Sequence, residues 1–251
     1  MSEKSEKIYV VGLGPGGIDH MTGAALAAMA DADIIAGYKT YIDLIADLDV
    51  VAGKDLRASG MRRERDRCRE CLDLAKAGKT VALVSSGDAG VYGMAGIMLA
   101  LAEKDPAEIE VEVVPGISAV NAAASILGAP LMHDYAVISL SDLLTDWDVI
   151  QKRIRFAGEG DFVIALYNPK SKGRPTNINT CQDILLTVKD PKTPVGIVQN
   201  AKRDGEKVCI TTLDAMADQE INMFSLVIIG NSKTTVSADG TQMITPRGYQ
   251  L

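Results

Sequence analysis

Two glycine-rich loops, each directly after a run of apolar residues, constrain the fold of this chain more than any other feature. The first loop, residues 12–17, follows the apolar run 8–11, and the second, residues 85–93, follows the run 80–84. Glycine in a strand-to-helix turn lets the backbone adopt positive φ and lets a ligand approach closely. The second loop also carries an acid, Asp88. Two such loops so early in the chain predict a site for a polar ligand that bears adenosine.

The first loop also fits a dinucleotide-binding fold, because its glycines satisfy the G-x-G-x-x-G pattern. Three features disfavour that alternative. Pro15 lacks the backbone N–H that would donate to a pyrophosphate. The next predicted strand, 33–36, carries its acid at its start and leads to Tyr38, whereas ribose binding requires an acid at the strand's end. The helix after the loop is expected to begin only at Thr22. A nicotinamide-dependent reductase is therefore the less favoured alternative.

The composition disfavours several classes of protein. With 47% hydrophobic and 24% charged residues, the chain has the make-up of an ordinary globular protein. Its net charge of −7 argues against nucleic-acid binding, which requires a basic face. No apolar run reaches the roughly 18 residues that cross a bilayer. The polar amino terminus, residues 1–6, is unlike a signal peptide. We expect a cytoplasmic protein with no nucleic-acid or membrane partner.

The cysteines favour a place in the core over a metal or redox site. Cys68 and Cys71 lie in a C-x-x-C pattern, but with Leu72 and Ala75 they also form the i, i+3, i+4, i+7 stripe of a predicted helix, 62–77. The other two cysteines stand alone, and the two histidines are far apart, so no metal-binding spacing occurs. We predict core cysteines and no metal site.

Strands and helices alternate through the first half of the chain, which predicts an open, mostly parallel sheet covered on both faces. A helix of small residues, 119–127, with Ser118 as its cap, is expected after Pro115-Gly116. We place the domain boundary there, with an N-terminal α/β domain at 1–116 and a C-terminal α/β domain at 117–251. The predicted strands of the first domain are residues 8–11, 33–36, 80–84 and 109–114.

The second half predicts a mixed sheet, because its later strands come close together with a hairpin turn at 203–206. A helix capped by Thr145 is expected to carry Trp147, Ile150 and Ile154 inward. The fold class is therefore α/β, with two α/β domains and an active-site cleft between them. The predicted strands of this half are residues 135–140, 162–166, 195–199, 208–212 and 226–229.

Three motifs occur in order along the chain: Gly12-Leu13-Gly14-Pro15-Gly16, then Ser86-Gly87-Asp88 with Tyr92, then Val114-Pro115-Gly116-Ile117-Ser118-Ala119. Together they resemble the tetrapyrrole (class III) methyltransferases over nearly the whole chain. That resemblance implies S-adenosylmethionine bound between two α/β domains, and a homodimer. Two positions depart from the pattern. Ala89 replaces the proline of a usual Gly-Asp-Pro loop, and Tyr38 stands where many members carry an acid, so their general base is not carried over.

Four further segments, residues 85–96, 127–144, 165–169 and 244–249, resemble one group within that family. Its members methylate C17 of a precorrin-3-type tetrapyrrole and help to contract the ring in cobalamin (vitamin B12) biosynthesis. The alternatives are a family member acting on another ring carbon or on another substrate, and a non-catalytic binding module that keeps the cleft without turnover. Whether the tetrapyrrole is metal-free or already holds cobalt stays open.

The resemblance also implies contacts with the methyl donor. Asp88 is expected to accept hydrogen bonds from the donor, although capping of the next helix is an alternative role for it. The implied cofactor residues are Pro15, Ser86, Gly87, Asp88, Val91, Tyr92, Ser118, Ala119, Tyr167, Asn168 and Ala201.

Ring contraction requires proton movements, so a proton donor or base is expected beside the macrocycle. We single out the residues around the predicted strand 135–140, with strand-end capping and a structural histidine as the alternative. His20 is a weaker candidate. The candidate catalytic residues are His133, Asp134, Ser139, Ser141, Asp142 and Tyr38.

The tetrapyrrole's many carboxylates call for basic groups despite the acidic total, and arginine can bind a carboxylate through two hydrogen bonds. For any single basic residue, solvated surface is the favoured alternative. The charge-rich segment 62–70 is expected to be a solvated helix face. The candidate substrate-binding residues are Lys39, Lys170, Lys172, Arg174 and Arg247.

Overall fold

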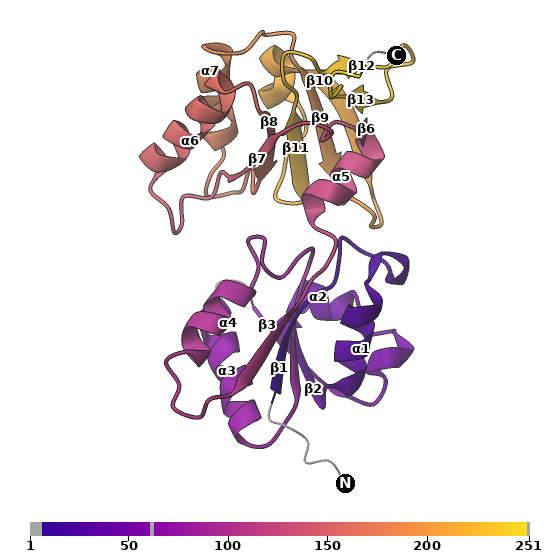
Figure 1. Cartoon of the computed structure of the whole chain (residues 1–251), viewed down its shortest axis with the longest axis vertical. Helices are drawn as coiled ribbons and strands as arrows, with labels where there is room; N and C mark the ends of the chain where they lie inside the picture. Colours follow the sequence, from indigo (N-terminus) through magenta and orange to yellow (C-terminus); the bar gives the residue numbers. More distant parts are fainter. Residues whose placement is uncertain (1–6, 61–62, 250–251) are drawn as a thin grey trace. The chain divides into compact units, whose positions relative to one another are not determined.

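The computed structural model describes residues 7–60 and 63–249. The polar amino terminus and Arg62, where one predicted helix begins, lie outside the described residues. The chain forms two compact units, Met1–Ala119 and Val120–Leu251. Each unit is built around a five-stranded sheet with helices packed against it (Figure 1). The α/β fold class predicted from the sequence is confirmed.

The sheet of the first unit is entirely parallel, as predicted, with strand order β3-β2-β4-β1-β5. Strand β1 lies between β4 and β5, and it pairs with β4 through Val11 and Val84 and with β5 through Val11 and Val114. All four predicted strands are confirmed. The fifth, β3, was missed because its polar sequence lies at the sheet's exposed edge. The strands are β1 (Lys7–Gly12), β2 (Ile34–Tyr38), β3 (Asp55–Ser59), β4 (Val81–Ser85) and β5 (Glu110–Val114).

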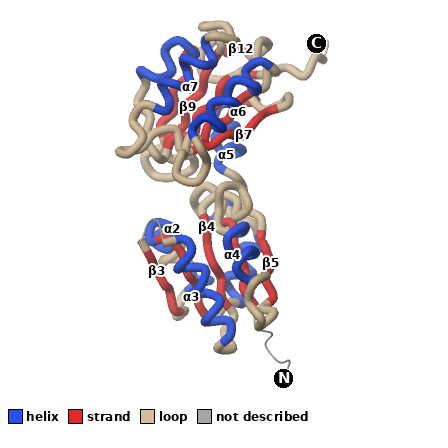
Figure 2. Tube along the Cα trace, turned by 90° about the vertical axis from the view of Figure 1, so that its left-hand side faces the viewer, coloured by secondary structure: helices blue, strands red, loops and turns tan. Residues whose placement is uncertain are grey.

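Helices cover both faces of this sheet. Helices α1 (Gly23–Asp31) and α2 (Lys39–Asp43) pack on one face, and α3 (Glu64–Lys76) and α4 (Ala95–Ala102) pack on the other (Figure 1). Figure 2 looks onto α3 and α4 in front of the strands. The described part of this unit also contains two short 3₁₀ turns, Ile18–His20 and Asp49–Val51.

Helix α3 confirms the predicted stripe, since Cys68, Cys71 and Leu72 are all buried in the core. Burial raises the pKa of the Cys68 thiol to about 11 and that of Cys71 to about 12, so both stay protonated and unreactive at neutral pH. The charged face of α3 was expected to be solvated. That expectation is wrong at Arg67, which is only 4% exposed. Its guanidinium donates to Ser59 Oγ at 2.6 Å, because the end of β3 covers it.

The second unit has the predicted mixed sheet, with strand order β10-β9-β11-β8-β7. Strands β7 and β8 are parallel, whereas β11 is antiparallel to both of its neighbours. All five predicted strands are confirmed. The strands are β7 (Tyr135–Ser139), β8 (Val163–Tyr167), β9 (Pro194–Gln199), β10 (Lys207–Thr212) and β11 (Ser225–Ile229), and a smaller sheet joins β6 (Gly128–Ala129), β12 (Thr235–Val236) and β13 (Met243–Ile244).

Helices α6 (Trp147–Glu159) and α7 (Asn177–Leu186) and the 3₁₀ helix Leu213–Asp218 form one core with this sheet. Helix α5 (Ala119–Leu127) has the predicted bounds. It approaches β9 so closely that a Cβ on Gly196 would lie 2.5 Å from Leu127 Cδ1. No described helix is long and apolar enough to span a membrane.

Two local predictions for this unit fare differently. The inward face of α6 is confirmed, because Ile150 and Ile154 are buried and Trp147 packs beside them. The cap is wrong. The helix begins after Asp146, and no side chain makes a capping hydrogen bond there, so Thr145 does not cap it. The predicted hairpin turn joins the antiparallel strands β9 and β10.

Candidate functional site

The three motifs of the first unit meet at one edge of its sheet. Strands β4, β1 and β5 are neighbours and run in the same direction, so the loops that follow them leave at the same carboxyl edge. Gly14 and Gly87 exchange two backbone hydrogen bonds, of 3.0 and 2.7 Å. Leu13 N donates to Ser85 O at 2.8 Å. The two glycine-rich loops are therefore joined directly by their backbones.

Only glycine fits where these loops cross. A Cβ on Gly12 would lie 2.7 Å from the backbone nitrogen of Gly116 and 2.8 Å from the carbonyl oxygen of Gly87. Gly14 and Gly87 also have φ of 74° and 67°, in the left-handed region that glycine adopts without strain. The glycines thus serve contacts between the loops themselves.

Asp88 fastens the second motif to the third. Its Oδ1 accepts a 2.8 Å hydrogen bond from Gly90 N, and its Oδ2 accepts one of 3.0 Å from Gly116 N. Helix α4 begins only after Met94, with no side-chain cap. The alternative role of Asp88 as the cap of that helix is therefore wrong.

The position of these loops in the sheet favours ligand binding. Strand β1 leads to α1 on one face of the sheet, and its neighbour β4 leads to α4 on the other face (Figure 1). Ligands of open α/β sheets bind at the carboxyl ends of adjacent strands whose connections diverge in this way. Gly14 and Gly87 lie at that point.

The same topology is unlike a dinucleotide-binding fold. In that fold β1 and β2 are neighbours, so an acid at the end of β2 reaches the ribose. Here β4 lies between them, and β2 ends at Tyr38. Helix α1 begins late, as predicted, after an intervening 3₁₀ turn, and Thr22 Oγ1 caps it, so its N-terminus does not begin at the loop.

The other candidate residues of this unit differ in exposure. Pro15 is buried, whereas Val91 and Tyr92 are exposed, and Tyr92 has an unusual φ of 52°. Tyr38 is half-buried, with its ring against that of Tyr41. The side chain of Lys39 is exposed and paired with Asp43 at 2.9 Å. The half-buried residues are Ser86, Ser118, Ala119 and His20.

In the second unit, a polar network joins the carboxyl ends of β7 and β8. Ser139 lies opposite Tyr167 in the parallel ladder, which places the residues after both strands at one edge. Asn168 Nδ2 donates to Ser139 Oγ at 3.0 Å, and Ser141 N donates to the same oxygen at 3.2 Å. Tyr167 Oη accepts a 3.0 Å bond from Val120 N at the start of α5.

Arg174 brings a buried positive charge to this network. Its side chain is 9% exposed, its Nη1 donates to Ser141 Oγ, and Nη1 lies 3.9 Å from Asp142 Oδ1. Its Nε is buried and makes no hydrogen bond to any residue that the structure describes. The structure thus joins two groups that were predicted separately: the residues after β7 and the basic loop after β8, in which Lys170 is half-buried and Lys172 exposed.

His133 and Asp134 lie at the opposite end of β7. They precede Tyr135, the first residue of that strand, whereas Ser139 is its last. His133 is exposed, and its Nδ1 accepts a 2.8 Å bond from Asp134 N. The structure therefore does not bring this pair to Ser139 and Asp142. Arg247 is exposed, beyond β13. Ala201 follows β9, which runs in the same direction as β7 and β8, so it lies at the edge that carries Ser139.

Comparison with known proteins identifies the family. The family described as Tetrapyrrole (Corrin/Porphyrin) Methylases matches residues 7–217. The chain belongs to this family. A probable cobalt-factor III C(17)-methyltransferase of Salmonella typhimurium is 51% identical over 244 residues, covering 97% of this chain and 100% of that protein. A cobalt-factor III methyltransferase of Priestia megaterium is 49% identical over 97% of this chain, which spans 45% of that protein's length.

The fold agrees with this assignment. The crystal structure of the methyltransferase CobJ matches this methylase with a TM-score of 0.87 and 35% identity, covering 95% of this chain and 99% of that one. This likeness extends through both α/β units.

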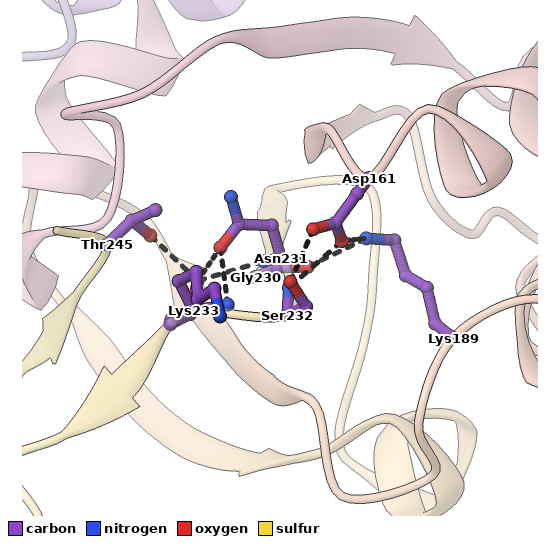
Figure 3. A network of polar contacts seen from close by, with 8 residues as sticks. Asp161, Lys189, Gly230, Asn231, Ser232, Lys233 and Thr245 are labelled. Atoms are coloured by element: carbon purple, nitrogen blue, oxygen red, sulfur yellow. Dashed lines mark hydrogen bonds and ion pairs between the residues drawn. The ribbon is translucent and has the colours of Figure 1, made fainter. Parts of the chain in front are cut away.

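Sequence reasoning missed one buried ionic network of this methylase, which Figure 3 shows. Lys189 Nζ, on a side chain 3% exposed, donates to Asp161 Oδ1 at 3.2 Å and to Gly230 O at 3.3 Å. Asp161 also accepts from the hydroxyl and backbone N–H of Ser232. No regular spacing marks these residues, because loops far apart in the sequence bring them together.

This network is structural. Asp161 lies just before β8 begins, away from the end that carries Asn168. Burial lowers the pKa of Lys189 despite its pairing with Asp161. Burial acts to raise the pKa of Asp161, but hydrogen bonds from Ser232 and Lys189 outweigh it and lower that pKa. Within residues 7–60 and 63–249, no group of three or more His, Cys, Asp or Glu could hold a metal ion.

Proposed function

We propose that this methylase transfers a methyl group from S-adenosylmethionine to C17 of cobalt-factor III, or of its metal-free counterpart precorrin-3B, with ring contraction in cobalamin biosynthesis. One observation carries the proposal: the chain matches a probable cobalt-factor III C(17)-methyltransferase along that protein's full length at 51% identity. The geometry supports it, since the glycine motifs of both loops meet at a ligand-binding edge of the parallel sheet.

The donor site is built around the loops of the first unit. A carboxylate has about four acceptor positions. The two backbone bonds of Asp88 leave capacity to accept from a hydroxyl or ammonium group of the donor. Ser86 lies beside it, the Gly87 carbonyl oxygen keeps a second lone pair beyond its bond from Gly14 N, and Pro15 and Val91 offer apolar contact. The further donor contacts that we propose are Tyr92, Ser118, Ala119, Tyr167, Asn168 and Ala201.

The sulfonium of S-adenosylmethionine makes its methyl group electrophilic. The protein's task is then to hold the accepting ring carbon in line with that methyl group. Positioning of this kind can lower a barrier by about 7–11 kcal/mol. Rigid backbone contacts such as Gly14 with Gly87 suit the task, because they fix the loops without relying on mobile side chains.

The tetrapyrrole's carboxylates require local cations in a chain of net charge −7. Arg174 meets that need best, because its guanidinium is held in place by Ser141 and a buried guanidinium favours an anion beside it. Lys170 lies in the same loop. Lys39, Lys172 and Arg247 are exposed, so we assign them a secondary role in attracting the anionic substrate.

The proton movements of ring contraction have three candidate groups in this proposal. Ser139, Ser141 and Asp142 lie together at the end of β7, with Arg174. His133 and Asp134 lie at the start of β7 and form a second candidate, with Tyr38 of the first unit a third. Turnover of single variants of each group separates them.

The active form in this proposal is a homodimer. Light scattering on the purified protein tests this directly. A mass of twice the chain's 26.7 kDa agrees with it, and a monomer at the concentration used for activity contradicts it.

The activity test uses purified protein, S-adenosylmethionine, and cobalt-factor III or precorrin-3B in separate reactions, with products followed by mass spectrometry. A product heavier by one methyl group supports the proposal, and the substrate that is consumed identifies the branch. Intact donor binding with neither substrate methylated indicates a family member that acts on another ring carbon or another tetrapyrrole.

A further inference from the structure

The hydrogen bonds of Ser139 can be counted atom by atom. Its Oγ accepts one from Asn168 Nδ2 at 3.0 Å and one from Ser141 N at 3.2 Å. A serine hydroxyl has two acceptor lone pairs and one O–H donor. Among the described residues, Ser139 Oγ makes no other hydrogen bond. Both acceptor positions are therefore occupied, and only the O–H group is left for a ligand.

We propose that Asn168 is a positioning residue, which makes Ser139 a hydrogen-bond donor to a peripheral carboxylate of the bound tetrapyrrole. This inference rests on the proposed function and names the part of the substrate that binds at the end of β7. It also changes the role expected for Ser139, because an oxygen whose lone pairs are both occupied does not serve as a general base.

The charges at this edge favour a carboxylate as the accepting group. The Arg174 guanidinium is buried and donates to Ser141 Oγ, next to the Ser141 N–H that bonds Ser139. Asp142 is the acid that faces it, at 3.9 Å from Nη1 and on a more exposed side chain. Hydrogen bonds to an ionised acceptor are roughly twice as strong as those between neutral groups. An anionic oxygen beside Ser139 would gain from both the hydroxyl and the guanidinium.

The backbone of Asn168 makes a precise substitution possible. Its φ is 50°, in the left-handed region that Asn and Asp adopt more readily than other residues with a side chain. Asn168→Asp therefore keeps the backbone and the side-chain size. It replaces the Nδ2 donor with a carboxylate oxygen, which in its ionised form accepts hydrogen bonds and cannot donate them. Ser139 would then donate its O–H to this carboxylate, and the substrate would lose its donor.

The first experiment measures the affinity for cobalt-factor III by absorbance titration without the methyl donor, in four variants. Ser139→Ala and Asn168→Asp are each expected to weaken binding about 10- to 100-fold, the effect of one hydrogen bond to a charged acceptor. The double variant is expected to bind no more weakly than either single variant. Asn179→Asp, on an exposed residue of α7, makes the same charge change outside the network and is expected to bind like the wild type.

Two results of this titration overturn the inference. One is wild-type affinity in Asn168→Asp, and the other is a double variant in which the two losses add. Where the wild type turns over, both single variants are expected to raise the KM for the tetrapyrrole by a larger factor than they lower kcat. A general loosening of the loop would instead lower kcat and the melting temperature together.

A second experiment tests the geometry without substrate. The two Nδ2 protons of Asn168 are assigned by nuclear magnetic resonance from the signals that Asn168→Asp removes. Ser139→Ala is expected to shift one of them and to speed its exchange with water, because its acceptor is gone. Unchanged signals overturn the inference. A protein that shows the shift but binds neither cobalt-factor III nor precorrin-3B contradicts the proposed function instead.

Discussion

The carboxylate of Asp88 accepts a 3.0 Å hydrogen bond from the backbone N–H of Gly116. These residues lie in the loops after β4 and β5, the two strands that flank β1 in the sheet. Asp88 thus links the two loops across the first glycine-rich loop, which packs between them at Gly12. The residue that we propose as a contact of the methyl donor therefore also joins the loops of the proposed site.

Because Asp88 has both roles, we expect its variants to lose affinity for the methyl donor to different extents. Asp88→Ala removes both backbone bonds and is expected to weaken binding of S-adenosylhomocysteine about 10- to 100-fold by calorimetry. Asp88→Asn keeps one accepting oxygen and should lose less. Asp47→Ala, at an exposed carboxylate of the same unit, serves as the control. Unchanged affinity in Asp88→Ala would remove Asp88 from the site.

Because the loops touch through their backbones, we expect that even the methyl side chain of alanine at position 116 disturbs them. Gly116→Ala places a Cβ 2.6 Å from Gly12 O, where no flexible group can move aside. We expect the Gly116→Ala protein to lose binding of the methyl donor and to melt several degrees lower than the wild type. Gly96→Ala is the matched control, since a Cβ there meets nothing within 4 Å and alanine favours the helix. A Gly116→Ala protein that melts and binds like the wild type contradicts the packing described.

The ion pair of Lys189 and Asp161 predicts an asymmetric effect on stability. Asp161→Asn leaves the buried Lys189 ammonium without an anion and is expected to cost about 3–5 kcal/mol in the free energy of unfolding. Lys189→Met leaves Asp161 with its two Ser232 bonds and partial exposure, at an expected cost of at most about 2 kcal/mol. Urea denaturation measures both values, and equal losses would refute the asymmetry.

The same carboxylate predicts a dependence of stability on pH. The folded-state pKa of Asp161 is lowered from its ordinary 3.8. Its contribution is therefore complete above about pH 3.8 and is lost as the pH falls through the lower folded value. Comparing denaturation of the wild type and Asp161→Asn from neutral to acid pH isolates this contribution. We expect the difference between the two proteins to shrink on acidification. A constant difference would contradict the lowered pKa.

We expect a change at the exposed His133 to affect turnover without affecting binding of the methyl donor. If it moves a proton during ring contraction, His133→Ala slows turnover while S-adenosylhomocysteine binds with wild-type affinity. His20→Ala, at the other histidine, provides the comparison. Wild-type turnover in His133→Ala assigns His133 a structural role, which its bond with the backbone of Asp134 would then explain.

Periodic patterns predicted the fold well, because burial of a stripe or an alternating face depends on local spacing. The four residues Cys68, Cys71, Leu72 and Ala75 illustrate this, and so do the bounds of α5. Strand β3 was missed because an edge strand needs no apolar run. The cap of α6 was misplaced by one residue, since a Thr-x-x-Asp pattern alone does not fix where the helical backbone begins.

The candidate site was harder to predict, because it depends on which strand ends become neighbours. Ser139 and Arg174 were each identified from sequence, but only the parallel pairing of β7 and β8 brings their loops together. The extended strand β7 separates His133 from Ser139, although they are close in sequence. The burial of Arg67 and Lys189 follows from chain segments that fold over them, which no local pattern reveals.

The central claim is transfer of a methyl group to C17. It is tested most directly with S-adenosylmethionine carrying a ¹³C-labelled methyl group and with cobalt-factor III or precorrin-3B, followed by carbon nuclear magnetic resonance of the isolated product. The account predicts a single enriched methyl signal that correlates with C17 of the ring. Enrichment at another ring carbon, or no enrichment with a protein that binds the donor, would contradict it.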